Sequence, residues 1–106
     1  MVFVMKAVSI IVEGNVQGVG FRYFTSMNAD KLGIKGWVRN LPNGNVEIEA
    51  SGEESILDRF IRVVSDGPPY SSVDFIDVKE LQETPHYTSF RITYWVIPYR
   101  KLQARM

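Results

Sequence analysis

The chain has no cysteine, a single histidine and no excess of charge of either sign. Without cysteine, disulfide bonds, thiolate metal sites and a cysteine nucleophile are all excluded. Twelve basic and twelve acidic side chains cancel, so no broad positive field would attract DNA, RNA or an anionic lipid surface. We therefore expect no nucleic-acid partner, while a local cluster of donors can still hold a small anion.

Long hydrophobic runs are also missing. No apolar run approaches the roughly 20 residues that a membrane-spanning helix needs. The apolar start, Met1–Met5, is interrupted by Lys6 and lacks the basic segment and cleavage site of a signal peptide. The 106 residues are 45% hydrophobic and 23% charged, which is typical of one soluble domain. We expect a cytoplasmic protein with no membrane contact.

The hydrophobic period changes early in the chain. Alternating apolar residues over Val8–Val12 predict a strand that ends at Gly14. A helical period predicts a helix from about Phe21 to Leu32, closed by Gly33 in a left-handed conformation. The side chains expected on one face of this helix are Phe21, Thr25, Asn28, Ala29 and Leu32.

The middle of the chain predicts a hairpin. Two strands, Gly36–Leu41 and Val46–Ala50, flank Asn43-Gly44, a pair that tolerates positive φ and favours a tight turn. In the second strand Glu47 and Glu49 alternate with apolar residues, so one face should be buried and the other solvated. We interpret these glutamates as part of the solvated face rather than as a metal site.

A second helix is expected from about Glu53 to Ser65. Ser51 and Glu54 have the spacing of a capping box with Ser51 as the N-cap, and Asp66-Gly67-Pro68-Pro69 would end the helix. Arg59 and Arg62 should line its outer face.

The order of elements indicates the fold. A fourth strand is expected within Val73–Leu81 and a fifth over Phe90–Tyr94. The resulting β-α-β-β-α-β order is typical of a ferredoxin-like α+β sandwich, an antiparallel sheet with two helices on one face. We expect residues 1–94 to form this domain and residues 95–106 to form a tail. Whether the tail extends the last strand or hangs free stays open.

The stretch Gly14–Arg22 is the first candidate for chemistry. Gly14, Gly18 and Gly20 allow the backbone to turn its N–H groups inward on an oxygen-rich ligand. The helix that follows adds the positive end of its dipole, and Arg22 adds a planar donor fork. The spacing fits neither a Walker A loop nor a dinucleotide fingerprint. The stretch suits a phosphate cradle, although a plain strand-to-helix turn has similar composition.

The second candidate is Gly36-Trp37-Val38-Arg39-Asn40, just before the hairpin. The carboxamide of Asn40 offers a donor and an acceptor, so it can hold a water and orient its lone pair. Alone, Asn40 also suits an ordinary turn residue before Leu41-Pro42. We interpret Trp37 as a packing aromatic.

Taken together, these two segments resemble the signatures of the acylphosphatase family. The first is Val12-Glu13-Gly14-Asn15-Val16-Gln17-Gly18-Val19-Gly20-Phe21-Arg22. The second is Gly36-Trp37-Val38-Arg39-Asn40, followed by Gly44, Val46 and Gly52 at the family's spacing. The resemblance spans roughly Lys6 to Tyr94, nearly the whole domain. Two departures are Asn15, where members often carry a basic or aromatic residue, and the tail after Tyr94, where many members end.

The resemblance implies hydrolysis of carboxyl–phosphate mixed anhydrides to a carboxylate and inorganic phosphate. By motif, Arg22 would bind the phosphoryl oxygens and Asn40 would position the attacking water. Loop residues whose backbone would complete the substrate site are Asn15, Val16, Gln17, Gly18, Val19, Gly20 and Phe21. It further implies a small-molecule acyl phosphate as substrate, no cofactor, no metal and a monomer.

An arginine, an asparagine and a ring of backbone amides are sufficient for this reaction. A carboxylate leaving group has a conjugate-acid pKa of about 4 and departs at neutral pH without a general acid. Phosphoryl transfer then asks mainly for positioning and charge stabilisation. No strong general base is evident beside the loop, and an oxygen of the substrate's own phosphate is one candidate for the water's proton.

Other interpretations share parts of this pattern. An acylphosphatase-like module that binds an anion without useful turnover is the first alternative. RNA-recognition modules share the topology, but they need sheet aromatics and a basic field, whereas the Val46–Ala50 strand carries carboxylates. The single histidine, His86, is interpreted as a solvated loop residue.

Overall fold

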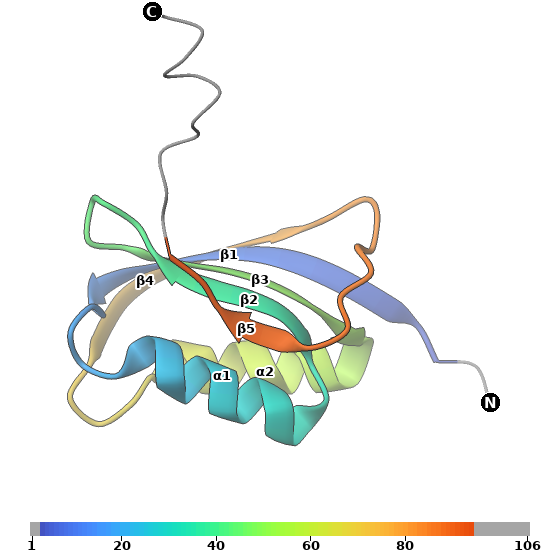
Figure 1. Cartoon of the computed structure of the whole chain (residues 1–106), viewed down its shortest axis with the longest axis horizontal. Coiled ribbons are helices and arrows are strands. Elements are labelled where there is room, and N and C mark those ends of the chain that lie inside the picture. Colours follow the sequence, from blue (N-terminus) through green and yellow to red (C-terminus); the bar gives the residue numbers. More distant parts are fainter. Residues whose placement is uncertain (1–2, 95–106) are drawn as a thin grey trace, which may run out of the picture.

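A five-stranded sheet carries two helices on one of its faces in the computed structural model, which describes residues 3–94 (Figure 1). The elements are β1 (Met5–Asn15), α1 (Phe21–Leu32), β2 (Lys35–Asn40), β3 (Val46–Glu53), α2 (Glu54–Asp66), β4 (Ser72–Glu80) and β5 (Phe90–Ile92). The strands lie in the order β4-β1-β3-β2-β5. Every predicted element is present, and the helix predicted over Phe21–Leu32 has those bounds. The predicted tail, residues 95–106, lies outside the described residues.

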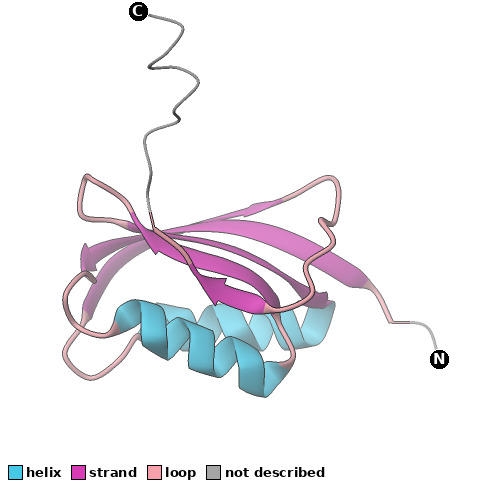
Figure 2. Ribbon diagram, viewed as in Figure 1, coloured by secondary structure: helices cyan, strands magenta, loops and turns pink. Residues whose placement is uncertain are grey.

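The pairing of the strands confirms the ferredoxin-like arrangement and corrects one detail. β1 pairs antiparallel with β3 and with β4, and β2 pairs antiparallel with β3. β5 runs parallel to β2, so the sheet is mixed rather than wholly antiparallel. The chain reaches β5 by crossing from one edge of the sheet to the other after β4, as Figure 2 shows. This crossing brings the end of β5 beside the end of β2.

The core lies between the sheet and the helices. Alternate residues of β1, β2 and β3 point toward α1 and α2, and the exposed fraction of most of them is close to zero. Phe60 of α2 packs edge-on against Phe90 of β5, with ring centroids 6.0 Å apart. On α1 the buried residues are Phe21, Thr25 and Ala29, while Asn28 and Leu32 are half-buried. The apolar periodicity therefore predicted the buried faces correctly.

The start of α2 differs from the prediction. Its N-cap is Glu53, whose carboxylate accepts hydrogen bonds from the backbone N–H groups of Ser55 and Ile56, each at 3.2 Å. Ser51 instead lies buried within β3, opposite Ala7 of β1. Because β1 begins well before the alternating run, pairing with it prolongs β3 past Ser51. The capping-box interpretation of Ser51 was therefore wrong.

Candidate functional site

The loop between β1 and α1 folds tightly because glycines stand where its backbone requires them. At Gly14, where the pairing of β1 with β4 shifts register, φ is 138°, and a Cβ atom would lie 2.1 Å from the Ser72 carbonyl oxygen. Gly18 and Gly20 have φ of 74° and 79°, in the left-handed region that side chains disfavour. The glycines thus turn the chain sharply from the sheet into α1.

This turn leaves backbone donors without acceptors. Within residues 3–94, no hydrogen bond is donated by the N–H groups of residues 16–20. Gly20 is the N-cap of α1 and offers no side-chain cap, and the first turn of the helix has no acidic residue. The positive end of the helix therefore meets no countercharge from its own first turn, which suits an anion.

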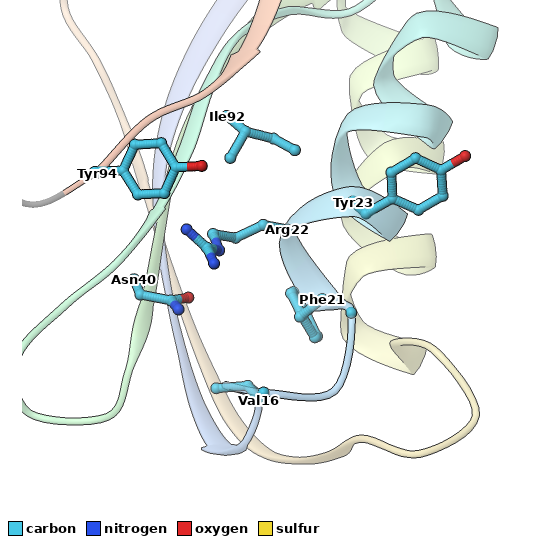
Figure 3. Close-up of a pocket in the computed structure, with 9 residues that line it drawn as sticks. Val16, Phe21, Arg22, Tyr23, Asn40, Ile92 and Tyr94 are labelled. Carbon is cyan, nitrogen blue, oxygen red and sulfur yellow. The ribbon is translucent and has the colours of Figure 1, made fainter.

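The two candidate segments meet at one cleft of about 210 Å³ (Figure 3). Arg22 reaches it from the first turn of α1, and Asn40 reaches it from the last position of β2. In Figure 3 the guanidinium of Arg22 extends toward the carboxamide of Asn40 and the ring of Tyr94. The residues that line the cleft are Val16, Gly18, Gly20, Phe21, Arg22, Tyr23, Asn40, Ile92 and Tyr94.

Asn40 carries an unpaired polar atom. Its side-chain oxygen Oδ1 is buried and has no hydrogen-bond partner among the described residues. Buried acceptors in folded proteins are nearly always paired, so an orphan beside a cleft indicates that a ligand or water completes it. The strand pairing of Asn40 with Val46 fixes the backbone from which this side chain projects.

Arg22 is half-buried and stacks against an aromatic ring. Its Cζ atom lies 5.2 Å from the ring centroid of Tyr94, within the range of a cation–π contact. Among the described residues no carboxylate forms an ion pair with Arg22. The aromatic ring therefore contacts the guanidinium of Arg22 but, unlike a carboxylate, leaves its positive charge available to an anion.

Three of the loop residues predicted to bind substrate do not line the cleft. Val16, Gly18, Gly20 and Phe21 do, whereas Asn15, Gln17 and Val19 are not among the lining residues. Asn15 ends β1 opposite Ser72, and Val19 packs against the core.

Gln17 does not line the cleft, but its side chain connects two segments that form it. Its Nε2 atom donates to the carbonyl oxygens of Leu41 and Asn45, at 2.8 and 2.7 Å. These two residues flank the β2–β3 turn, and Leu41 follows Asn40 directly. The side chain of Gln17 therefore ties the glycine loop to the hairpin that carries Asn40.

Sequence reasoning missed three side chains of the cleft, Tyr23, Ile92 and Tyr94. Alternation over Phe90–Tyr94 predicted a strand, but not that its end would lie beside Arg22. That proximity follows from the pairing of β5 with β2, which joins residues about fifty positions apart.

The remaining candidates have structural roles. Glu47 forms an ion pair with Arg39, at 2.7 Å between Oε1 and Nη2, and Glu49 accepts a hydrogen bond from the hydroxyl of Tyr87. Both glutamates are half-buried on the face of the sheet away from the helices, so this face is more ordered than a freely solvated one.

Three surface predictions are confirmed, since His86, Arg59 and Arg62 are exposed. Trp37 is half-buried and lies 4.9 Å from the guanidinium of Arg39, in keeping with a packing role. Within residues 3–94, no group of three or more His, Cys, Asp or Glu side chains is placed to hold a metal ion. No helix in that range is long and apolar enough to cross a membrane.

Comparison with known proteins shows to which family the chain is similar. The acylphosphatase family model matches residues 8–92. An acylphosphatase of Archaeoglobus fulgidus is 53% identical over 90 residues, which are 85% of this chain and 100% of that protein. The crystal structure of acylphosphatase from Bacillus subtilis superposes with a TM-score of 0.82 at 45% identity, covering 86% of this chain and 100% of that chain.

A larger protein contains the same fold. Full-length HypF, in its phosphate- and nucleotide-bound form, matches with a TM-score of 0.77 and 38% identity. The match covers 88% of this chain but 12% of that one. The extent of the family match, together with the relatives that are covered in full, shows that this chain belongs to the acylphosphatase family.

Proposed function

We propose that this chain is an acylphosphatase that cleaves the carboxyl–phosphate bond of small acyl phosphates, with Arg22 and Asn40 as its catalytic residues. The observation that carries the assignment is the meeting of these two side chains at one cleft. There the charge of Arg22, the uncapped end of α1 and the orphaned Asn40 oxygen face a common space.

The phosphoryl group binds at the glycine loop and Arg22. Free backbone N–H groups of the loop donate to its oxygens, and the guanidinium fork donates two further hydrogen bonds. These donors are fixed before the substrate arrives, so they stabilise the negative charge that the transition state spreads over the phosphoryl oxygens.

Asn40 positions the nucleophile. Its buried Oδ1 accepts a hydrogen bond from a water molecule and directs a lone pair of that water at phosphorus. The water attacks phosphorus, the bond from phosphorus to the acyl oxygen breaks, and the acyl group departs as a carboxylate. A phosphoryl oxygen is the proposed acceptor of the water's proton.

The reaction needs neither a metal nor a general acid. The carboxylate leaves unprotonated because its conjugate acid has a pKa of about 4. Arg22 and the helix end supply the positive charge that a metal ion supplies in other phosphoryl-transfer enzymes. We also propose that the enzyme acts as a monomer in the cytoplasm.

A binding module without turnover is the second candidate. It is raised by HypF, in which the matched fold is a small portion of a larger protein. Steady-state hydrolysis of benzoyl phosphate by the full chain separates the two, once spontaneous hydrolysis is subtracted. Saturable turnover, inhibited competitively by inorganic phosphate, supports the enzyme. A folded chain that binds phosphate but gives no turnover would favour the module.

A further inference from the structure

Apolar and aromatic side chains line the cleft beside Arg22 and Asn40. Beside the cleft lies a second hollow of about 420 Å³, which shares Arg22, Asn40 and Tyr94 with it. The side chains that it adds are Leu41 and Pro42, at the start of the β2–β3 turn. Arg22 is the only charged residue among those that line either hollow in the described part of the chain.

Tyr94 lies where the two hollows meet. Its side chain is 70% exposed, and it stacks against Arg22. Ile92, the last residue of β5 and two residues before Tyr94, is 36% exposed and also lines the cleft (Figure 3). Large apolar side chains are costly to leave in water, so their concentration around an anion site suggests contact with an apolar part of a ligand.

We infer that Tyr94, with Ile92 and Leu41 beside it, forms a binding surface for the acyl group and favours substrates with a flat, apolar acyl group. The inference rests on the proposed function, because it takes the phosphoryl group to be held at the loop and Arg22. The acyl group extends from the bound phosphoryl group into either the cleft or the second hollow. Tyr94 lines both of them, so the acyl group lies beside its ring in either case.

The consequence is a substrate preference that the phosphate site alone cannot give. An aromatic acyl group gains contact with the Tyr94 ring, whereas an acetyl group is too small to cover it. Aromatic pairs of this kind contribute a factor of roughly two to ten. The preference should appear mainly in KM, because this contact is made equally in the bound substrate and in the transition state.

The test compares kcat/KM for benzoyl phosphate and acetyl phosphate in the full chain and in three variants. Tyr94→Ala removes the ring, and Tyr94→Phe keeps the ring but removes the hydroxyl. Tyr70→Ala is the matched control, since Tyr70 is 85% exposed and lines neither hollow. The ratio of the two substrates within each protein cancels any general change in activity, including a weaker hold on Arg22.

We expect Tyr94→Ala to lower the benzoyl-to-acetyl ratio by roughly two- to ten-fold, while Tyr94→Phe and Tyr70→Ala retain the ratio of the unmodified chain. An unchanged ratio in Tyr94→Ala, with both substrates reduced equally, would overturn the inference and leave Tyr94 as support for Arg22 alone. Failure of the unmodified chain to hydrolyse either substrate would instead contradict the proposed function.

Discussion

Gln17 offers the sharpest test of how the site is held together. Its Nε2 group donates to the carbonyls of Leu41 and Asn45, and those carbonyls also accept from the N–H groups of Gly44 and Leu41 across the turn. Gln17→Ala removes both side-chain bonds without adding a clash. Two neutral hydrogen bonds contribute together about 1–3 kcal/mol to the free energy of unfolding.

A loss of that size lowers the melting temperature of a domain of this length by roughly 4–20 °C. The loop and the hairpin also lose their common tie, so Asn40 is held less accurately against Arg22. Misplacement by about an ångström can reduce a rate by roughly 100-fold. We therefore expect kcat for benzoyl phosphate to fall by about 10- to 100-fold, while KM changes little.

Gln17→Glu sharpens the comparison. The glutamate side chain has nearly the same shape as glutamine, but its ionised carboxylate cannot donate a hydrogen bond. That carboxylate would lie against the carbonyl oxygens of Leu41 and Asn45. It should therefore destabilise the chain more than Gln17→Ala does. Asn28→Ala is the matched control, since the Asn28 amide donates to the Phe24 carbonyl at 2.8 Å within α1, and neither residue lines the cleft.

Urea unfolding followed by circular dichroism, together with steady-state kinetics, measures both effects. The reasoning is refuted if Gln17→Ala has the unfolding midpoint and kcat of the unmodified chain. Equal losses of kcat in Gln17→Ala and Asn28→Ala would likewise show that the tie between loop and hairpin is unimportant for catalysis.

Three further predictions follow from other parts of the molecule. Arg22→Ala should weaken both phosphate inhibition and turnover, and Arg22→Lys should restore little because the planar fork is lost; full recovery with lysine in a steady-state assay would contradict a role for the fork. Hydrogen bonds from Ser55 hold the pKa of Glu53 below its ordinary value of 4.5, so its ionised form stabilises the fold above that pH, and this contribution is lost as the pH falls through the lowered pKa. Glu53→Gln should accordingly reduce the melting temperature at neutral pH and converge with the unmodified chain in acid, whereas a gap independent of pH would exclude this source. Dialysis against EDTA should leave the turnover rate unchanged, and a loss reversed by added divalent metal would disprove a metal-independent reaction.

The sequence was informative wherever a local pattern determines local structure. The change of hydrophobic period located β1 and α1, and the Asn43-Gly44 pair located the hairpin. Arg22 and Asn40 were found as candidates because each lies in a short motif, and the structure brings both motifs to one cleft.

Features set by long-range pairing were not accessible in the same way. Ser51 has the local pattern of a helix cap, but pairing of β3 with the early part of β1 buries it in a strand. The contact of Tyr94 with Arg22 depends on the placement of β5 beside β2, and the bonds of Gln17 cross between two loops. No periodicity or spacing in the sequence encodes these contacts directly.

The measurement that tests the central claim most directly is steady-state hydrolysis of benzoyl phosphate by Asn40→Ala, beside the inhibition constant of inorganic phosphate in the same variant. If Asn40 positions the water while Arg22 and the loop hold the phosphoryl group, turnover disappears and phosphate inhibits with an unchanged constant. Turnover at the rate of the unmodified chain, or a loss of phosphate affinity as large as that of Arg22→Ala, would contradict the account.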